Sequence, residues 1–183
     1  DKNKSALLEI LSKDVSVFYC DHHVAGDIPE VENLDALINT ASDVCTSLLI
    51  NSRLKGAVAK WAVVGAFGDN LDKSARVLAK KIGVDEADTA KLKNLGIYIN
   101  YNGYGSSLDD LHFEPAELYE LLKNYQDPLE FIADTSSAFA KLEAGYNDDM
   151  EKARGAKILR ESAIASAVLL PDEKWARRVS GVY

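Results

Sequence analysis

Three adjacent residues with metal-binding side chains, Asp21, His22 and His23, follow a short apolar run at residues 15–20. The run is rich in β-branched and aromatic residues, which predicts a buried strand. In a parallel α/β sheet, ligands bind in the crevice outside the carboxyl ends of the strands, so this strand would hold one carboxylate and two imidazoles at that edge. Imidazole nitrogen and carboxylate oxygen together suit manganese, zinc or iron. The tripeptide therefore predicts a metal site.

A second candidate ligand, Asp69, ends a segment at residues 57–69 that is apolar on every side. Periodicity does not distinguish a buried strand from a buried helix here, but the length of the segment and its alanines and glycines favour a helix in the core. A buried carboxylate is unfavourable unless a metal or hydrogen bonds compensate it. Asp69 is therefore the residue that the predicted site can least do without.

These two segments together resemble a known family. Residues 18–23 read Phe-Tyr-Cys-Asp-His-His, and residues 61–70 read Trp-Ala-Val-Val-Gly-Ala-Phe-Gly-Asp-Asn. They look like the third and fourth motifs of the DHH phosphoesterase superfamily, and the likeness spans most of the chain. That superfamily includes RecJ-type single-strand exonucleases, oligoribonucleotide and cyclic-dinucleotide phosphodiesterases, and manganese pyrophosphatases.

The resemblance implies a role for each residue of the two motifs. His22 and Asp69 would be metal ligands, with Asp69 bridging two ions, and the cofactor would be manganese or, alternatively, magnesium. His23 would be catalytic and point at the substrate phosphate. Asp21 would act with it by orienting the neighbouring imidazole, since a ligating histidine usually donates its other N–H to a carboxylate. The plainer alternatives are surface imidazoles and, for Asp21, a turn former at the end of a strand.

The chain also departs from the family pattern. In the family, an Asp-x-Asp pair and a further Asp motif precede the histidines, but the twenty residues before Asp21 contain neither. A smaller domain with a glycine-rich loop usually follows, and no such loop occurs before Tyr183. We therefore expect the chain to be the middle part of a longer protein and to carry half of a two-metal site.

The predicted fold class is α/β. We expect a partial parallel sheet with a helix-rich remainder, which together form part of a DHH-type domain that ends in a long linker helix. The domain prediction is a partial DHH domain at residues 1–145, a linker helix at 146–170 and the start of a second domain at 171–183. A second strand is expected at residues 34–40. A further strand is expected at residues 175–183; it would need a neighbouring strand to pair with, so we expect the chain to self-associate. Helices are expected at residues 5–12, 43–54 with Ser42 as N-cap, 73–82, 86–98, 115–124, 128–143 and 148–170.

Composition constrains the location and the partners of the protein. The chain is 47% hydrophobic and 27% charged, and no apolar run approaches the roughly 20 residues that cross a bilayer. We expect a cytoplasmic protein without membrane contact, in which Cys20 and Cys45 are small core residues of a reducing compartment. The net charge is −8, and the basic residues are scattered along the sequence rather than gathered on a basic face. We therefore favour a nucleotide, a short oligonucleotide or another small phosphate ester as the substrate, and binding of long DNA remains an open alternative.

A second group of candidate residues lies at positions 100–105, where two asparagines, two tyrosines and two glycines form a predicted turn. Tyr101 and Tyr104 could stack on a base while Asn102 and the turn amides meet phosphate. The alternative is a helix C-terminus closed by Asn102 and Gly103. His112 has no partner in the sequence. Three acidic residues near it, expected to form a solvated helix start rather than a metal site, are Asp109, Asp110 and Glu114.

Two functions are consistent with the sequence. The first is a metal-dependent phosphoesterase that cleaves phosphodiester or phosphoanhydride bonds by two-metal activation of water. The second is a non-catalytic nucleotide-binding or scaffold domain that retains the DHH fold. An Asp-x-Asp pair after an upstream strand would support the first function, and its absence would support the second.

Overall fold

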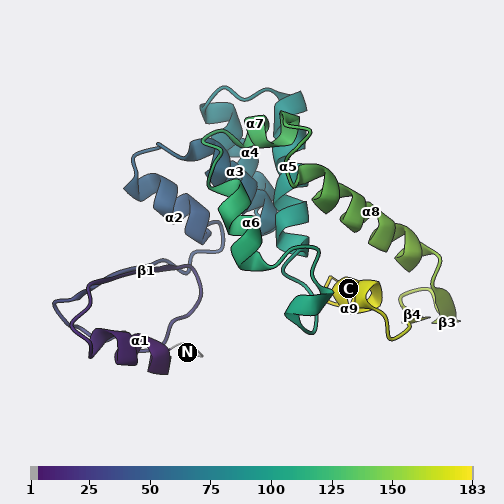
Figure 1. Cartoon of the computed structure of the whole chain (residues 1–183), viewed down its shortest axis with the longest axis horizontal. Helices are drawn as coiled ribbons and strands as arrows, with labels where there is room; N and C mark the ends of the chain where they lie inside the picture. Colours follow the sequence, from purple (N-terminus) through teal and green to yellow (C-terminus); the bar gives the residue numbers. More distant parts are fainter. Residues whose placement is uncertain (1–3, 183) are drawn as a thin grey trace. The chain divides into compact units, whose positions relative to one another are not determined.

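The computed structural model describes residues 4–182 and divides into two compact units, which are considered separately. The first unit runs to Asp85 and the second begins at Glu86 (Figure 1). The predicted boundaries near residues 145 and 170 both fall inside the second unit. The chain is a mixed α/β protein with a small parallel sheet, as expected for its fold class.

The first unit combines a two-stranded sheet with four helices. Its elements are α1 (Lys4–Leu11), β1 (Val17–Asp21), β2 (Leu34–Ile38), α2 (Thr46–Arg53), α3 (Ala59–Gly68) and α4 (Asp72–Lys81). Both predicted strands are confirmed, and they pair in parallel from Val17 opposite Leu34 to Asp21 opposite Ile38. Because parallel strands end at the same edge, the residues after β1 and β2 meet there. The backbone amide of Asn39 donates to the carbonyl of Asp21 at 3.2 Å.

The strand at the tripeptide is less buried than its composition predicts. Val15 and Phe18 are 48% and 44% exposed. The prediction of a buried strand is therefore wrong, and the reason is the width of the sheet, which has two strands within residues 4–182. Arg53 covers part of the open face, with its guanidinium carbon 4.3 Å from the centre of the Phe18 ring.

The predicted core helix at residues 57–69 is confirmed as α3, which packs against α2 and α4. A Cβ atom on Gly65 would lie 2.5 Å from Ser47 Oγ, so only glycine allows this close approach of α3 to α2. Helix α2 begins at Thr46 rather than at residue 43, and its N-cap is Cys45 instead of Ser42. The Asn39 side chain accepts the Ala41 amide and so stabilises a turn just before the residues where the helix was expected. Buried α3 side chains are Ala62, Val63, Val64, Ala66 and Phe67.

The second unit is mainly helical (Figure 1). Helix α5 packs against α7 and α8, and α8 packs against α9. Proline starts α6 and α7, as the sequence predicts. The elements are α5 (Glu86–Tyr101), η1 (Leu108–Asp110), α6 (Pro115–Leu122), α7 (Pro128–Ala133), α8 (Phe139–Arg154), β3 (Lys157–Glu161), β4 (Ser166–Leu169) and α9 (Lys174–Val179).

The helix expected at residues 128–143 is broken at Asp134 into α7 and α8. One carboxylate oxygen of Asp134 accepts the backbone amide and hydroxyl of Ser136, and the other accepts the Tyr125 hydroxyl at 2.6 Å. These bonds hold the pKa of Asp134 below its usual value. Hydrogen bonds of this kind between a side chain and the nearby backbone compete with those of a helix, so the helix ends here.

The predicted linker helix at residues 148–170 is confirmed only as far as Arg154 and is wrong beyond it. Helix α8 ends at Arg154 with Gly155 as C-cap, and an antiparallel hairpin of β3 and β4 follows. Ser162 closes the hairpin turn, since its hydroxyl oxygen accepts the amide of Ala165 and donates to the carbonyl of the same residue. Alanine-rich composition favoured a helix, but this local hydrogen bonding favours the turn.

The C-terminal residues also differ from expectation, because the strand expected at residues 175–183 is replaced by a helix within the described residues. Residues Lys174–Val179 form the helix α9 inside the second unit. Its Ala176 and Val179 side chains are 2% and 0% exposed, so the helix buries one face against its own unit.

A buried ion pair holds α9 in place. Arg178 donates to both carboxylate oxygens of Asp149, at 2.6 and 2.8 Å, and Asp149 is fully buried. The hydroxyl of Tyr101 donates to the same carboxylate at 2.8 Å. Although burial raises the pKa of Asp149, the bonds from Arg178 and Tyr101 more than offset it and hold the pKa below its usual value.

Asp110, from the predicted solvated helix start, and the nearby His112 belong to this interior instead. Asp109 in η1 and Glu114, the N-cap of α6, are exposed as expected. Asp110 is 2% exposed and pairs with Arg177 through two bonds at 2.8 and 2.9 Å, which hold its pKa well below the usual range. His112 packs on Gly145, where a Cβ would lie 2.5 Å from the ring. Its Nε2 atom is buried without a hydrogen-bond partner among the described residues, 3.4 Å from an oxygen of Asp149.

Replacement of Arg178 by Met should lower the free energy of unfolding of the second unit by about 3–5 kcal/mol, because it leaves the buried Asp149 carboxylate uncompensated. Urea denaturation followed by circular dichroism measures the loss. Lys152→Met is the matched control, since it removes an exposed ion pair with Asp148 on the same helix and should change stability by less than about 1 kcal/mol. Equal effects of the two substitutions would contradict a structural role for the buried pair.

Stability of the second unit should fall as the pH drops from 7 to 5. Burial, followed by the charge of Arg178, lowers the pKa of His112, so the unfolded chain binds a proton more readily than the folded one. The stabilisation is therefore present above about pH 6.5, the usual pKa of a histidine, and is lost as the pH falls below that value. Hydrogen exchange of the α8 amides measures the change, and His112→Asn should remove this pH dependence. An unchanged slope in that variant would contradict the assignment to His112.

Candidate metal centre

The tripeptide lies where the sequence predicts, at the carboxyl end of a parallel strand. Asp21 is the last residue of β1, and His22 and His23 follow it directly. The three side chains offer ligand atoms that all lie within 4.8 Å of one another, and among the described residues they form the one such group of three or more. The side chain of His23 is 74% exposed and that of His22 is 19% exposed, so the two imidazoles have different surroundings.

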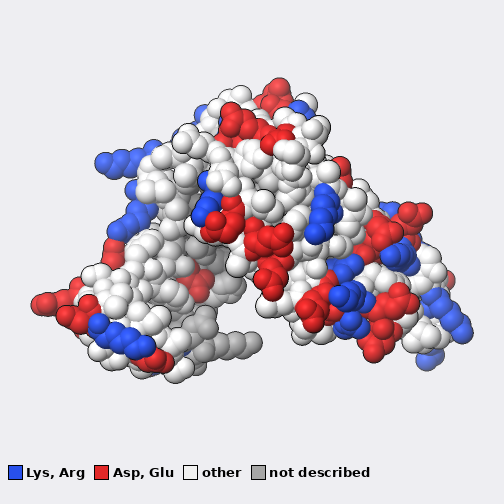
Figure 2. Space-filling model, viewed as in Figure 1, with Lys and Arg blue, Asp and Glu red and all other residues white. Residues whose placement is uncertain are grey.

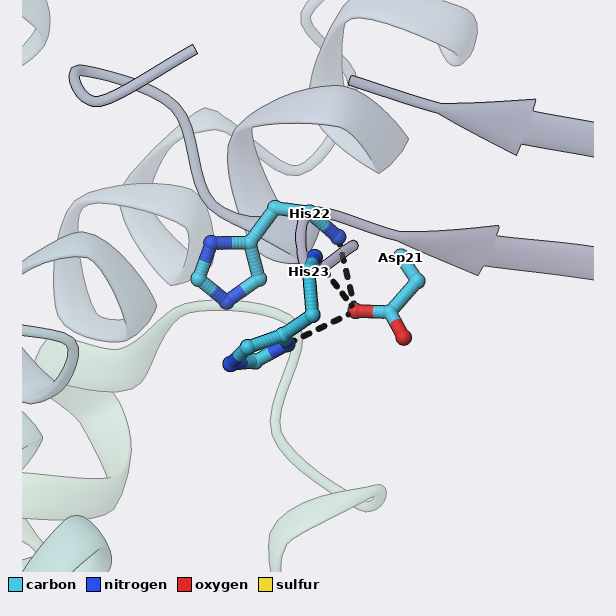
Figure 3. Close-up of side chains that lie close together, drawn as sticks. All are labelled: Asp21, His22 and His23. Carbon is cyan, nitrogen blue, oxygen red and sulfur yellow. Dashed lines mark hydrogen bonds and ion pairs between the residues drawn. The ribbon is translucent and has the colours of Figure 1, made fainter. Parts of the chain in front are cut away.

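Both oxygens of the Asp21 carboxylate are occupied by hydrogen bonds. Figure 3 shows three donors that converge on Oδ1: the backbone amides of His22 at 2.7 Å and His23 at 3.1 Å, and the His23 ring at 2.9 Å. Oδ2 accepts the hydroxyl of Tyr19 at 3.1 Å. The bond from the His23 side chain holds the pKa of Asp21 well below its usual range, although partial burial by itself would raise that pKa. Asp21 is therefore an ionised carboxylate that orients its neighbours rather than a free metal ligand.

The bond between His23 and Asp21 determines which nitrogen of His23 is free. A carboxylate oxygen only accepts hydrogen bonds, so the Nδ1 atom of His23 carries the hydrogen. The Nε2 atom then presents a lone pair, or an N–H when the ring is protonated. Because the ring is mostly exposed, the Nε2–H of the protonated ring can donate to an external oxygen such as that of a phosphate.

His22 and Asp69 form the second half of the arrangement. His22 Nε2 lies 3.4 Å from Asp69 Oδ2, which brings together the two residues predicted to be metal ligands. Ligand bonds of about 2.0–2.2 Å put neighbouring ligand atoms about 3.0–3.5 Å apart, depending on the coordination geometry. The observed separation therefore fits two ligands of one ion.

Helix α3 and the turn after it place the Asp69 carboxylate. Asp69 is the C-cap of α3, and Asn70 takes a left-handed conformation with φ of 59° that ends the helix. The Asp69 side chain is 39% exposed, so it is less buried than an apolar helix end predicts. Asn70 therefore closes α3 rather than capping α4, whose N-cap is Leu71.

The donor set fits a divalent ion such as manganese or zinc, but it is small. His22 and Asp69 provide one imidazole and one carboxylate that face each other. Partial burial, followed by the nearby Asp21 charge, raises the pKa of the Cys20 thiol, so Cys20 stays protonated and is a poor ligand. Two divalent ions carry four positive charges, for which the described residues supply few carboxylates here. The arrangement fits one ion better than two.

The predicted substrate-contacting tyrosines lie in the second unit and are used for packing there. Tyr101 is 2% exposed, and its pKa is raised by burial and then by Asp149. The Asn102 side chain bonds both the amide and the carbonyl of Phe113, at 3.0 and 2.9 Å. Tyr104 is half-buried against Gly181, where a Cβ would lie 2.4 Å from the ring. Burial of Tyr101 and Asn102 speaks against a base-stacking turn and favours the alternative of a closed helix C-terminus.

Sequence reasoning missed Tyr19 as a member of the site. Its signal is available in hindsight: side chains at positions i and i+2 of a strand project from the same face, so Tyr19 and Asp21 are neighbours once β1 is recognised.

Manganese should bind this chain weakly. Metal affinity falls steeply when charge-compensating ligands are missing, and here one carboxylate faces one imidazole. Isothermal titration calorimetry with Mn²⁺ should show no tight site, and the weak heat should disappear in His22→Ala. A stoichiometric two-ion complex of submicromolar affinity would contradict this reading of the donor set.

Comparisons with known proteins do not assign the chain to a family. No protein-family model matches it, and neither a curated protein nor a solved structure matches it at a significant level. The DHH resemblance therefore rests on the residues of the two motifs. The geometry adds that His22 and Asp69, which lie in separate motifs, come within 3.4 Å of each other in the folded chain.

Proposed function

We propose that this chain carries part of the active site of a metal-dependent phosphoesterase, similar to the DHH superfamily. The observation that carries the proposal is the 3.4 Å approach of His22 Nε2 to Asp69 Oδ2, beside a His23 ring with a free Nε2 atom. Metal ligands and a cationic hydrogen-bond donor for phosphate, such as a protonated imidazole, are components that phosphoryl chemistry uses.

Each residue has a separate task in this proposal. His22 and Asp69 would hold a divalent ion, manganese or alternatively magnesium, which when bound would activate water and stabilise charge on the phosphoryl oxygens. Asp21 keeps its negative charge and fixes the His23 ring through Nδ1. His23 then directs Nε2 towards a non-bridging phosphate oxygen, and in its protonated form donates a hydrogen bond to the charge that develops there.

The charge distribution favours a small substrate. The chain has a net charge of −8, and Figure 2 shows acidic and basic side chains interspersed, without a continuous basic surface, on the face drawn. Proteins that bind long nucleic acids obtain most of their affinity from phosphate contacts on a basic surface. A nucleotide, a short oligonucleotide or another small phosphate ester therefore suits this chain. No helix within residues 4–182 is long and apolar enough to cross a membrane.

Asp69→Asn and His22→Ala should each lower kcat/KM for phosphoester hydrolysis by at least about 100-fold, because the metal ligands act as a unit. The assay uses Mn²⁺ and a dinucleotide substrate, with the protein including any sequence that flanks residues 1–183 in the gene. Asp43→Asn is the matched control, since Asp43 is an exposed carboxylate of the same unit. His23→Ala should lower kcat and retain more metal than His22→Ala.

The same assay separates the two candidate functions. Full activity of Asp69→Asn would remove the phosphoesterase assignment. Nucleotide binding without hydrolysis in the wild-type protein would instead support a non-catalytic binding or scaffold domain, a function that the exposed His23 ring could also serve.

A further inference from the structure

Tyr19 is bonded to the one carboxylate that organises the tripeptide. Its hydroxyl lies 3.1 Å from Asp21 Oδ2, and the opposite oxygen, Oδ1, receives the two backbone amides and the His23 ring. A carboxylate can rotate about its terminal torsion with little resistance. A donor on Oδ2 restrains that rotation, so Oδ1 remains aimed at the His23 Nδ1 atom.

The strand makes this arrangement rigid. Tyr19 and Asp21 lie two residues apart on β1 and project from the same face, while β1 is paired with β2 along its full length. Both residues are partly buried, whereas the His23 ring is mostly exposed. The His23 ring contacts the tilted ring of His22, at 4.1 Å between centroids, and the one hydrogen bond of its side chain within the described residues is to Asp21, which therefore fixes its orientation.

We infer that Tyr19 is a positioning residue for the proposed phosphoesterase site: its hydroxyl fixes the Asp21 carboxylate, which in turn holds His23 as the Nδ1–H tautomer with Nε2 directed outward. The inference rests on the proposed function for its purpose, since only a reacting or binding imidazole needs one defined nitrogen. Outer hydrogen-bond partners of this kind commonly fix the tautomer and orientation of functional histidines.

The test measures the tautomer of His23 directly in metal-free protein. Long-range ¹H–¹⁵N correlation spectra at about pH 8.5, where imidazole is neutral, give the ratio of Nδ1–H to Nε2–H forms, with His23→Gln used for assignment. The ratio should favour Nδ1–H in the wild type and fall about threefold in Tyr19→Phe, which removes only the hydroxyl. Asp21→Ala should give the largest fall in the ratio, and it therefore shows how far the ratio drops when the hydrogen bond to the ring is lost altogether.

Two further variants separate the hydroxyl from general effects. Tyr125→Phe is the matched control, because Tyr125 also donates to a carboxylate, that of Asp134 at 2.6 Å, but in the second unit. It should leave the ratio unchanged. Tyr19→Leu removes the ring as well and should match Tyr19→Phe if the hydroxyl is responsible, provided that the amide spectrum of β2 shows an intact sheet.

A ratio in Tyr19→Phe within about 20% of the wild-type value, with Asp21→Ala still lowering it, would overturn the positioning role. Because the spectra need neither metal nor substrate, this outcome is distinct from failure of the proposed function, which the hydrolysis assay reports. A lowered ratio in a protein without hydrolytic activity would support the role of Tyr19 and contradict only the phosphoesterase assignment.

Discussion

The hydrogen-bonded carboxylate of Asp21 is the constraint on which the candidate site depends. It receives four donors, three on one oxygen and one on the other, which matches the roughly four lone-pair positions that a carboxylate offers. These bonds fix the orientation of the carboxylate, and through the two backbone amides they also fix the start of the chain that leaves the strand. The two following histidines differ in their contacts as a result. His23 is tied to Asp21 and turns to solvent, while His22 is free to face Asp69.

The approach of His22 to Asp69 depends in turn on helix packing. Asp69 reaches the site because α3 ends beside it, and α3 can pack closely on α2 because Gly65 leaves room for Ser47. A larger residue at position 65 would move α3, and the C-terminal end of this helix carries the candidate ligand Asp69. Small residues in an apolar segment are therefore part of the site's geometry, although none of them takes part in chemistry.

The sequence predicts the local features of this protein better than those set by long-range pairing. The strand before Asp21, its partner at residues 34–38 and the core helix before Asp69 follow from composition, turn residues and length, and each is confirmed. The helix predicted at residues 148–170 is wrong beyond Arg154, because alanine content indicates helix propensity but not the cross-strand partners that form a hairpin. The pairing of Arg178 with Asp149 could not be predicted, since nothing in the spacing of the two residues links them. The same limit applies to Tyr101, whose ring is exposed or buried according to where α8 and α9 pack.

Distance alone does not distinguish a functional carboxylate from a structural one in this chain. His22 lies 3.4 Å from Asp69, and His112 lies the same 3.4 Å from Asp149. Asp149 is fully buried and its charge is compensated by two bonds from Arg178 and one from Tyr101, so an added cation would meet a carboxylate that is already neutralised. Asp69 is 39% exposed, and among the described residues His22 is the one basic side chain within 4.0 Å of its carboxylate. The difference in compensation, rather than the geometry of the pair, makes Asp69 the residue with charge left to bind a metal ion.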